Sequence, residues 1–140
     1  MKLVRSAKAV IINSQGKVLL LRRSGTHPRL AFDADLPGGD IEKGETFETG
    51  LVREIKEETG LDVDESALHL LHAVTWDNIP GVSINRLLYA VRLEKAAPEV
   101  AISWEHSEYN WVKITELAGL EKPYQEGVDY ANKHNLWGEL

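Results

Sequence analysis

Three glutamates, Glu54, Glu57 and Glu58, lie within the short stretch "REIKEETG" at residues 53 to 60. On a helix, carboxylates three and four positions apart are neighbours on one face and repel one another. A cation bound between them removes that repulsion, and hard divalent cations prefer carboxylate oxygens. The sequence has no cysteine that could build a thiolate site instead. We therefore expect these side chains to bind Mg²⁺ or, alternatively, Mn²⁺.

A helix from about residue 46 to residue 59 is expected to carry the glutamates, because apolar side chains recur every four positions, at Phe47, Leu51 and Ile55. At about 100° per residue, Glu54 and Glu58 lie about 20° to either side of Phe47, at the border of the apolar stripe. An ordinary surface helix turns its charges away from that stripe. The placement of these acids favours a functional cluster over a solvated surface.

The elements around this helix mix strands and helices without a regular repeat. Two apolar runs flank the turn "NSQGK" and predict a hairpin, residues 24 to 35 predict a loop, and "PGG" at 37 to 39 predicts a turn. Further strands are predicted near residues 68–76, 84–93 and 109–114, and a second helix near 124–136. This order favours an α+β fold in which a mixed sheet lies between helices.

Length and charge narrow the class of protein. The 140 residues, 43% of them hydrophobic, fit one soluble domain spanning residues 1 to 140. A formal net charge of -6 argues against duplex nucleic acid as a partner, because phosphate backbones are bound by surplus Lys and Arg. No apolar run is long enough to span a bilayer, so no membrane partner is expected. We expect a cytoplasmic protein, either a monomer or a homodimer.

The segment from residue 39 to residue 61, "GDIEKGETFETGLVREIKEETGL", resembles the Nudix box, G-x5-E-x7-R-E-U-x-E-E-x-G-U, where U is aliphatic. Every defined position is filled, by Gly39, Glu45, Arg53, Glu54, Ile55, Glu57, Glu58, Gly60 and Leu61. Gly50-Leu51 replaces the pair of alanines found in many members, and Gly50 leaves room either for a metal cluster or for close packing. The resemblance implies the family's α/β/α sandwich over the whole chain.

The resemblance also implies roles for the residues of the box. The metal ligands would be the carbonyl of Gly38 with the three glutamates of the opening stretch, Glu54, Glu57 and Glu58. Arg53 and Glu45 match a pair that does not bind the metal itself and in which the arginine orients the acidic residues. Such enzymes hydrolyse a nucleoside diphosphate linked to another group by attack of water on phosphorus, assisted by divalent ions.

A general base is expected close to the metal. Mut-type members of the family have a glutamate six residues before a strand tryptophan, and here Glu105 precedes Trp111 by six residues. Glu105 is therefore the first candidate for the base or a further metal ligand, and Glu108 is the alternative. Glu57 competes for the same role, because members differ in which glutamate serves as base.

Substrate contacts are expected outside the box. Arg23 matches a phosphate-binding arginine of the Mut-type members, His27 and Arg29 lie in the loop that follows, and Trp76 is a candidate to stack on a nucleobase. The positions that identify enzymes acting on ADP-ribose or diadenosine polyphosphates hold other residues here. By elimination we expect a nucleoside or deoxynucleoside triphosphate, cleaved to the monophosphate and pyrophosphate. The alternatives are an ADP-ribose, dinucleoside polyphosphate or nucleotide-sugar pyrophosphatase, and a non-catalytic nucleotide sensor.

Overall fold

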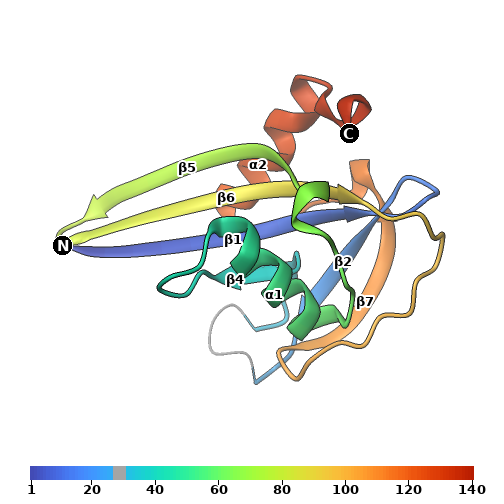
Figure 1. Cartoon of the computed structure of the whole chain (residues 1–140), viewed down its shortest axis with the longest axis horizontal. Helices are drawn as coiled ribbons and strands as arrows, with labels where there is room; N and C mark the ends of the chain where they lie inside the picture. The colour runs from blue at the N-terminus through green and yellow to red at the C-terminus, as the bar shows by residue number, and fades with distance from the viewer. Residues whose placement is uncertain (27–30) are drawn as a thin grey trace.

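Long β-strands and two α-helices position the candidate site residues (Figure 1). The computed structural model of the chain describes residues 1–26 and 31–140. The strands are β1 (Lys2–Ile12), β2 (Lys17–Arg23), β3 (Ala34–Asp35), β4 (Gly38–Asp40), β5 (His69–Ile79), β6 (Val82–Arg92) and β7 (His106–Lys113). The α-helices within these described ranges are α1 (Phe47–Thr59) and α2 (Lys122–Lys133), and short 3-10 turns cover Glu65–Ala67, Ile114–Glu116 and Leu136–Glu139.

The strands form one mixed sheet with the order β3-β2-β1-β6-β5. β1 runs parallel to β6 over its whole length, and β5 and β6 form a long antiparallel hairpin. β1 and β2 pair only where Ile12 faces Val18, so the two strands diverge from that point. The short strand β4 pairs with β1 on the opened side, with Gly39 opposite Ala7, and β7 pairs with β2.

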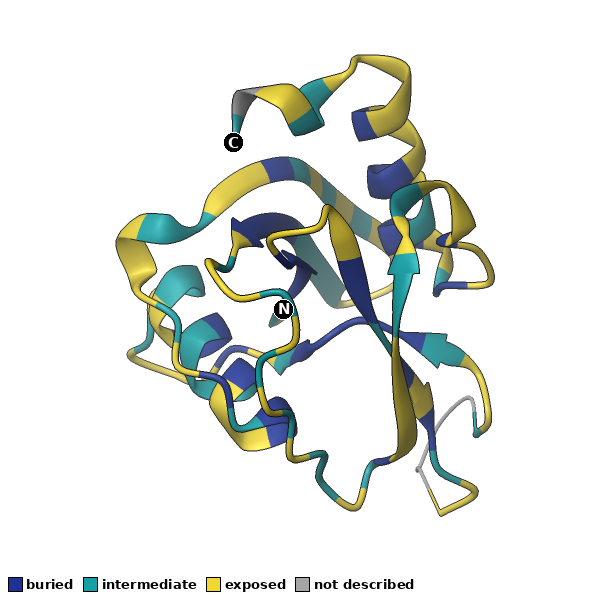
Figure 2. Ribbon diagram, turned by 90° about the vertical axis from the view of Figure 1, so that its right-hand side faces the viewer, coloured by how far each residue is buried: buried dark blue, intermediate teal, exposed yellow. Residues whose placement is uncertain are grey.

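Each face of the sheet is covered by a helix. Neighbouring strand residues point to opposite faces, so one strand contributes apolar side chains to the packing on both faces. Val10 and Ile12 of β1 belong to a hydrophobic cluster with Tyr124 and Val128 of α2, and the members of this cluster are buried. Ala9 and Ile11 belong to a second cluster with Leu51 and Ile55 of α1. Figure 2 shows the buried residues along the strands and on the helix faces toward the sheet. The expected α+β arrangement of a mixed sheet between helices is confirmed.

Most predicted elements are present, with shifted boundaries. The predicted helix at 46–59 is α1, while the turn predicted at 37–39 is wrong, because Gly38–Asp40 forms β4 against β1. Glycine has no side chain, so it can lie close to a neighbouring strand without a steric clash. The glycines that predict a turn from the sequence are therefore equally compatible with this strand. In the part of the chain that the structure describes, no helix is long and apolar enough to cross a membrane.

Candidate active site

Helix α1 begins and ends at well-defined caps, which fix the direction of its glutamates. The Thr46 side chain accepts a hydrogen bond from the Thr49 amide at 3.0 Å, and Gly60 ends the helix with φ of 75°, a left-handed conformation that glycine adopts readily. Leu51 and Ile55 are fully buried and set the rotation of the helix. That rotation turns Glu58 toward the sheet, where it is only 4% exposed.

The three glutamates do not share one environment. Glu54 and Glu58 line a cleft of about 550 Å³ together with Gly38 and Gly39. The Glu57 side chain is 58% exposed, accepts a hydrogen bond from Arg53 at 3.2 Å and is not among the described residues that line the cleft. The structure therefore brings two of the three predicted glutamate ligands together in the cleft, while the third, Glu57, is hydrogen-bonded to Arg53 beside them.

The two glycines of β4 make room for these carboxylates. The amide of Gly38 donates a hydrogen bond to Oε2 of Glu58 at 2.8 Å. With φ of 140°, Gly38 lies so close to β1 that a side chain there would collide with the backbone of Ala7 and Lys8. A Cβ on Gly39 would lie 2.9 Å from Cδ of Glu54. Glycine at position 38 thus permits the close approach of β4 to β1, and glycine at position 39 leaves room for the carboxylate of Glu54.

Burial raises the pKa of both helix glutamates that line the cleft, Glu54 and Glu58. The pKa of Glu58 rises to about 8, mainly because the group is buried, although Lys8 and the Gly38 amide oppose the shift. Burial also raises the pKa of Glu54 above its ordinary value. A divalent cation in the cleft favours the charged form of both groups.

The donor set fits a hard divalent cation that shares its coordination with substrate. Among residues 1–26 and 31–140, no three His, Asp or Glu side chains converge tightly enough to enclose a metal alone. Mg²⁺ ordinarily takes one or two protein carboxylates and completes its shell with water and phosphate oxygens. Glu54 and Glu58, with the adjacent backbone of Gly38, supply a set of that kind.

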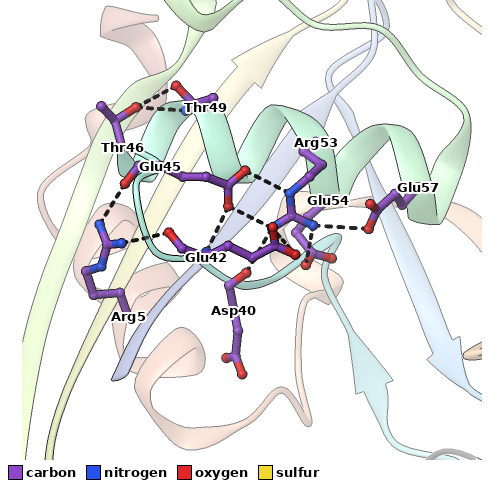
Figure 3. A network of polar contacts seen from close by, with 9 residues as sticks. All are labelled: Arg5, Asp40, Glu42, Glu45, Thr46, Thr49, Arg53, Glu54 and Glu57. Atoms are coloured by element: carbon purple, nitrogen blue, oxygen red, sulfur yellow. Dashed lines mark hydrogen bonds and ion pairs between the residues drawn. The ribbon is translucent and has the colours of Figure 1, made fainter. Parts of the chain in front are cut away.

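Arg53 joins the glutamates to the loop before α1 (Figure 3). Its Nε donates to Oε2 of Glu45 at 2.8 Å and its Nη2 to Oε1 of the same carboxylate at 2.9 Å. Its Nη1 donates to Glu54 at 3.1 Å and to Glu57 at 3.2 Å. The guanidinium hydrogen bonds lower the pKa of Glu45 to about 2. Arg53 is therefore hydrogen-bonded to Glu45, Glu54 and Glu57 at the same time.

Gly50 belongs to this support and not to the cleft. A Cβ there would lie 2.7 Å from Cδ1 of Ile41 and 3.0 Å from Oε1 of Glu45. Of the two roles open to Gly50 from the sequence, the structure supports close packing against the loop before the helix.

A buried ionic cluster around Asp35 lies on the same cleft and was not predicted from the sequence. Lys8 Nζ donates to Oδ1 of Asp35 at 2.8 Å, Arg23 Nη2 donates to the same oxygen at 3.2 Å, and His106 Nε2 lies 2.9 Å from Oδ2. Burial alone would raise the pKa of Asp35, but Lys8, the His106 hydrogen bond and Arg23 together hold it well below its usual range. A lone lysine within the apolar run "AKAVII" was the available signal.

Arg23 is the predicted phosphate ligand, and it lines the cleft at only 3% exposure. Its Nε and Nη1 are buried without a hydrogen-bond partner among the described residues. Buried donors of this kind are rare in proteins and call for a ligand or an ordered water. Its neighbour Arg22 points to solvent and pairs with Glu108 at 3.0 Å. The alternation of the strand thus separates the two arginines as expected.

The remaining candidates occupy different places. Glu105 lines the cleft, whereas the Glu108 carboxylate is exposed and paired with Arg22. Trp76 borders a separate hollow of about 360 Å³ and packs against Arg86, whose own side chain lines the cleft. His27 and Arg29 lie outside the described residues. A further hollow of about 600 Å³, formed by segments 60–67 and 91–101, contains none of the candidate residues.

Comparison with known proteins agrees with this geometry. A family model described as "NUDIX domain" matches residues 2–131. An ADP-ribose pyrophosphatase of Methanocaldococcus jannaschii is 51% identical over 51 residues, which cover 36% of this chain and 29% of that protein. The 8-oxo-dGTP diphosphatase of Escherichia coli K12 is 38% identical over 61 residues, 44% of this chain and 46% of that protein. The chain thus matches less than half the length of each of these two relatives.

The fold has solved counterparts over almost its full length. The crystal structure of a MutT protein from Methanosarcina mazei Go1 superposes with a TM-score of 0.78 at 26% identity, covering 96% of both chains. The family model and this structural similarity both cover the helix that carries the glutamates and the strands that surround the cleft.

Proposed function

Because this chain belongs to the Nudix family, we propose that its residues 1 to 140 form one domain that hydrolyses a nucleoside or deoxynucleoside triphosphate to the monophosphate and pyrophosphate. The observation that carries the proposal is the composition of one cleft, which combines the carboxylates of Glu54 and Glu58 with the buried guanidinium of Arg23. Carboxylates recruit a divalent cation, and a guanidinium with unpaired donors recruits phosphate.

The metal would be Mg²⁺, with Mn²⁺ as the alternative, held by Glu54, Glu58 and the carbonyl of Gly38. Glu57 would join these ligands by leaving its contact with Arg53. When bound, the ion supplies charge neutralisation for the phosphates and lowers the pKa of a bound water.

Arg23 and Lys8 would hold the phosphates of the substrate. Both side chains line the cleft, and Asp35 fixes their positions through hydrogen bonds at 3.2 and 2.8 Å. One carboxylate faces two cations, so the cluster keeps a surplus positive charge toward the cleft. The Arg23 donors that lack a partner among the described residues would bond phosphate oxygens.

Glu105 would act as the general base, because it lines the cleft while Glu108 is exposed and paired with Arg22. It would accept a proton from the attacking water as the oxygen bonds to phosphorus. The phosphorus–oxygen bond to the leaving group then breaks, and the electron pair departs with that group. Glu57 remains the other candidate for this role.

The relatives support two substrate classes. A relative is named 8-oxo-dGTP diphosphatase, which favours a nucleoside triphosphate. Another is named ADP-ribose pyrophosphatase, which favours ADP-ribose as the second candidate. A third possibility is a domain that binds nucleotides without hydrolysis, which the complete set of box glutamates argues against.

The deciding experiment measures phosphate and pyrophosphate release from a panel of nucleotides with Mg²⁺ or Mn²⁺. The panel comprises dNTPs, oxidised dNTPs, ADP-ribose, dinucleoside polyphosphates and nucleotide sugars. Reaction in ¹⁸O-labelled water then identifies the attacked phosphorus from the product that carries the label. Glu57→Gln is expected to lower kcat by several orders of magnitude with the fold intact, since it removes either a ligand or the base. Tight binding of a nucleotide without release of any product would instead support the sensor.

A further inference from the structure

An ion pair between Arg86 of β6 and Glu121, the residue that precedes α2, lies in the cleft away from the box glutamates. The Arg86 Nη1 donates to Oε2 of Glu121 at 3.0 Å, and the two side chains are 11% and 15% exposed. Both residues line the cleft with Ile84 and Val4. The pair has no role in holding metal or phosphate in the function proposed above.

Trp76 supports this pair from outside the cleft. On the paired strands β5 and β6, Trp76 faces Ile84, so it lies diagonally beside Arg86 on the same face of the sheet. The guanidinium carbon of Arg86 lies 5.1 Å from the centre of the indole ring. Trp76 therefore contacts the arginine and not the cleft itself. The Arg86 Nε is buried and has no hydrogen-bond partner among the described residues.

The distance across the sheet between the Arg86–Glu121 pair and the proposed metal ligands is about the length of a nucleoside. β4, which carries Gly38 and Gly39, pairs with one edge of β1, and β6, which carries Arg86, pairs with the other edge. Two interstrand spacings of nearly 5 Å place β6 about 10 Å from β4. A nucleotide with its phosphates at Glu54 and Arg23 would lay its sugar across β1 and its base over β6.

We propose that Arg86 and Glu121 recognise the hydrogen-bonding edge of guanine, with Trp76 as a positioning residue for Arg86. The proposal rests on the function proposed above and identifies the nucleoside that the same cleft accepts. A carboxylate only accepts hydrogen bonds, and a guanidinium only donates them. The ligand must therefore present donors beside an acceptor.

Guanine matches that requirement in the order of its atoms. Its N1–H and 2-amino group stand side by side and fit the two oxygens of one carboxylate, and O6 next to them accepts from a guanidinium. A carboxylate has about four acceptor positions, so Glu121 can keep its existing contacts, the bond to Arg86 among them, while it binds the base. Adenine, cytosine and thymine lack two adjacent N–H donors on different atoms, so none of them uses both carboxylate oxygens in this way.

Binding to the full chain tests the proposal independently of hydrolysis. Affinities for the α,β-methylene analogues of dGTP, dITP, dATP, dCTP and dTTP are measured by calorimetry with Mg²⁺. The dITP analogue lacks the 2-amino group, and wild-type protein is expected to bind it about tenfold more weakly than the dGTP analogue. Glu121→Gln is expected to lose roughly 10- to 100-fold in affinity for the dGTP analogue. Glu126→Gln, which changes an acid of α2 that does not line the cleft, is the matched control.

The role of Trp76 has its own readout. Trp76→Leu is expected to raise KM for dGTP roughly threefold to tenfold without changing kcat, because the arginine loses the ring that holds it. Trp76→Tyr restores a ring face and is expected to recover most of the wild-type KM. A Tyr variant no better than the Leu variant would overturn the positioning role.

The outcomes separate this proposal from the one on which it rests. Equal affinity for all five analogues, or unchanged preference in a folded Glu121→Gln, would overturn guanine recognition while leaving metal-dependent hydrolysis intact. Preference for the dCTP analogue would also overturn it. Selective binding of the dGTP analogue that depends on Glu121, in a protein that hydrolyses nothing, would uphold recognition and refute the hydrolase.

Discussion

Arg53 and Glu45 are joined by two parallel hydrogen bonds, at 2.8 and 2.9 Å, between a helix and the loop that precedes it. The same guanidinium reaches Glu54 and Glu57, so it connects the loop to two of the proposed metal ligands. The planar fork of arginine makes this possible, and a lysine ammonium cannot reproduce it.

Arg53→Lys is therefore expected to lower kcat at least tenfold and to lower the free energy of unfolding by about 1–2 kcal/mol. Steady-state kinetics and urea unfolding measure the two effects. Lys56→Gln, which changes an exposed residue of the same helix and breaks its pair with Asp62, is the control and is expected to leave kcat unchanged and to cost at most about 1 kcal/mol. Unchanged kcat in Arg53→Lys would show that charge alone suffices at this position.

Asp35→Asn is expected to destabilise the fold by about 3–5 kcal/mol, because it leaves Lys8 and Arg23 as buried cations without their partner. Denaturant unfolding measures the loss. The matched control is Glu108→Gln, which breaks an exposed pair with Arg22 and is expected to cost at most about 1 kcal/mol. Equal effects of the two substitutions would contradict the assignment of Asp35 as the centre of a buried cluster.

Acid should remove the contribution of Asp35. Its pKa in the folded protein lies below the ordinary value of 3.8, so the folded state binds fewer protons than the unfolded chain. The stabilisation is fully present above pH 3.8 and is lost as the pH falls through the folded pKa. The difference in unfolding free energy between wild type and Asp35→Asn is expected to shrink below that pH. A constant difference down to the lowest pH at which both fold would count against this linkage.

Mg²⁺ should stabilise the fold through Glu58. Saturation of a site at 100 times its dissociation constant adds about 2.7 kcal/mol to the free energy of unfolding, and the melting temperature rises accordingly. Glu58→Gln and Glu54→Gln are expected to lose most of that rise, whereas exposed Glu65→Gln should keep it. Thermal melts with and without Mg²⁺, and without nucleotide, provide the measurement. A full Mg²⁺ response in both cleft variants would place the metal elsewhere.

Gly39→Ala should uncouple activity from stability. The atoms nearest to the added methyl belong to the carboxyl end of Glu54, which can swing away, so the free energy of unfolding is expected to change by less than about 1 kcal/mol. The displaced Glu54 no longer serves the metal, so kcat and the Mg²⁺-induced melting shift are expected to fall together. Gly138→Ala, where a Cβ meets nothing within 4 Å, is the control. Full activity in Gly39→Ala would show that Glu54 tolerates a different position.

The helix with its glutamates was predictable because its signals are local. The apolar spacing acts within one stretch of chain, and so do the threonine and the glycine that cap α1 in the structure. Strand β4 was not predictable, because its pairing depends on a strand about 30 residues away whose approach the sequence does not encode locally. The buried partners of Asp35 were missed for the same reason, since they come from β1, β2 and β7.

The position of Trp76 illustrates a second limit of sequence reasoning. An aromatic residue before a turn is a reasonable candidate for stacking on a base, and strand alternation gives its face. Only the pairing of β5 with β6 shows that Arg86 lies between Trp76 and the cleft. Arg86 and Glu121, 35 residues apart, carry no common motif that could have revealed their contact.

The two hydrophobic clusters on opposite faces of the sheet support different ends of the cleft. Leu51 and Ile55 hold the helix of the glutamates, and Tyr124 and Val128 hold the helix that follows Glu121. Substitutions that repack one cluster need not disturb the other, because the sheet lies between them. If both proposals hold, the chain could change in evolution which molecule it accepts while the residues proposed to break the bond stay constant.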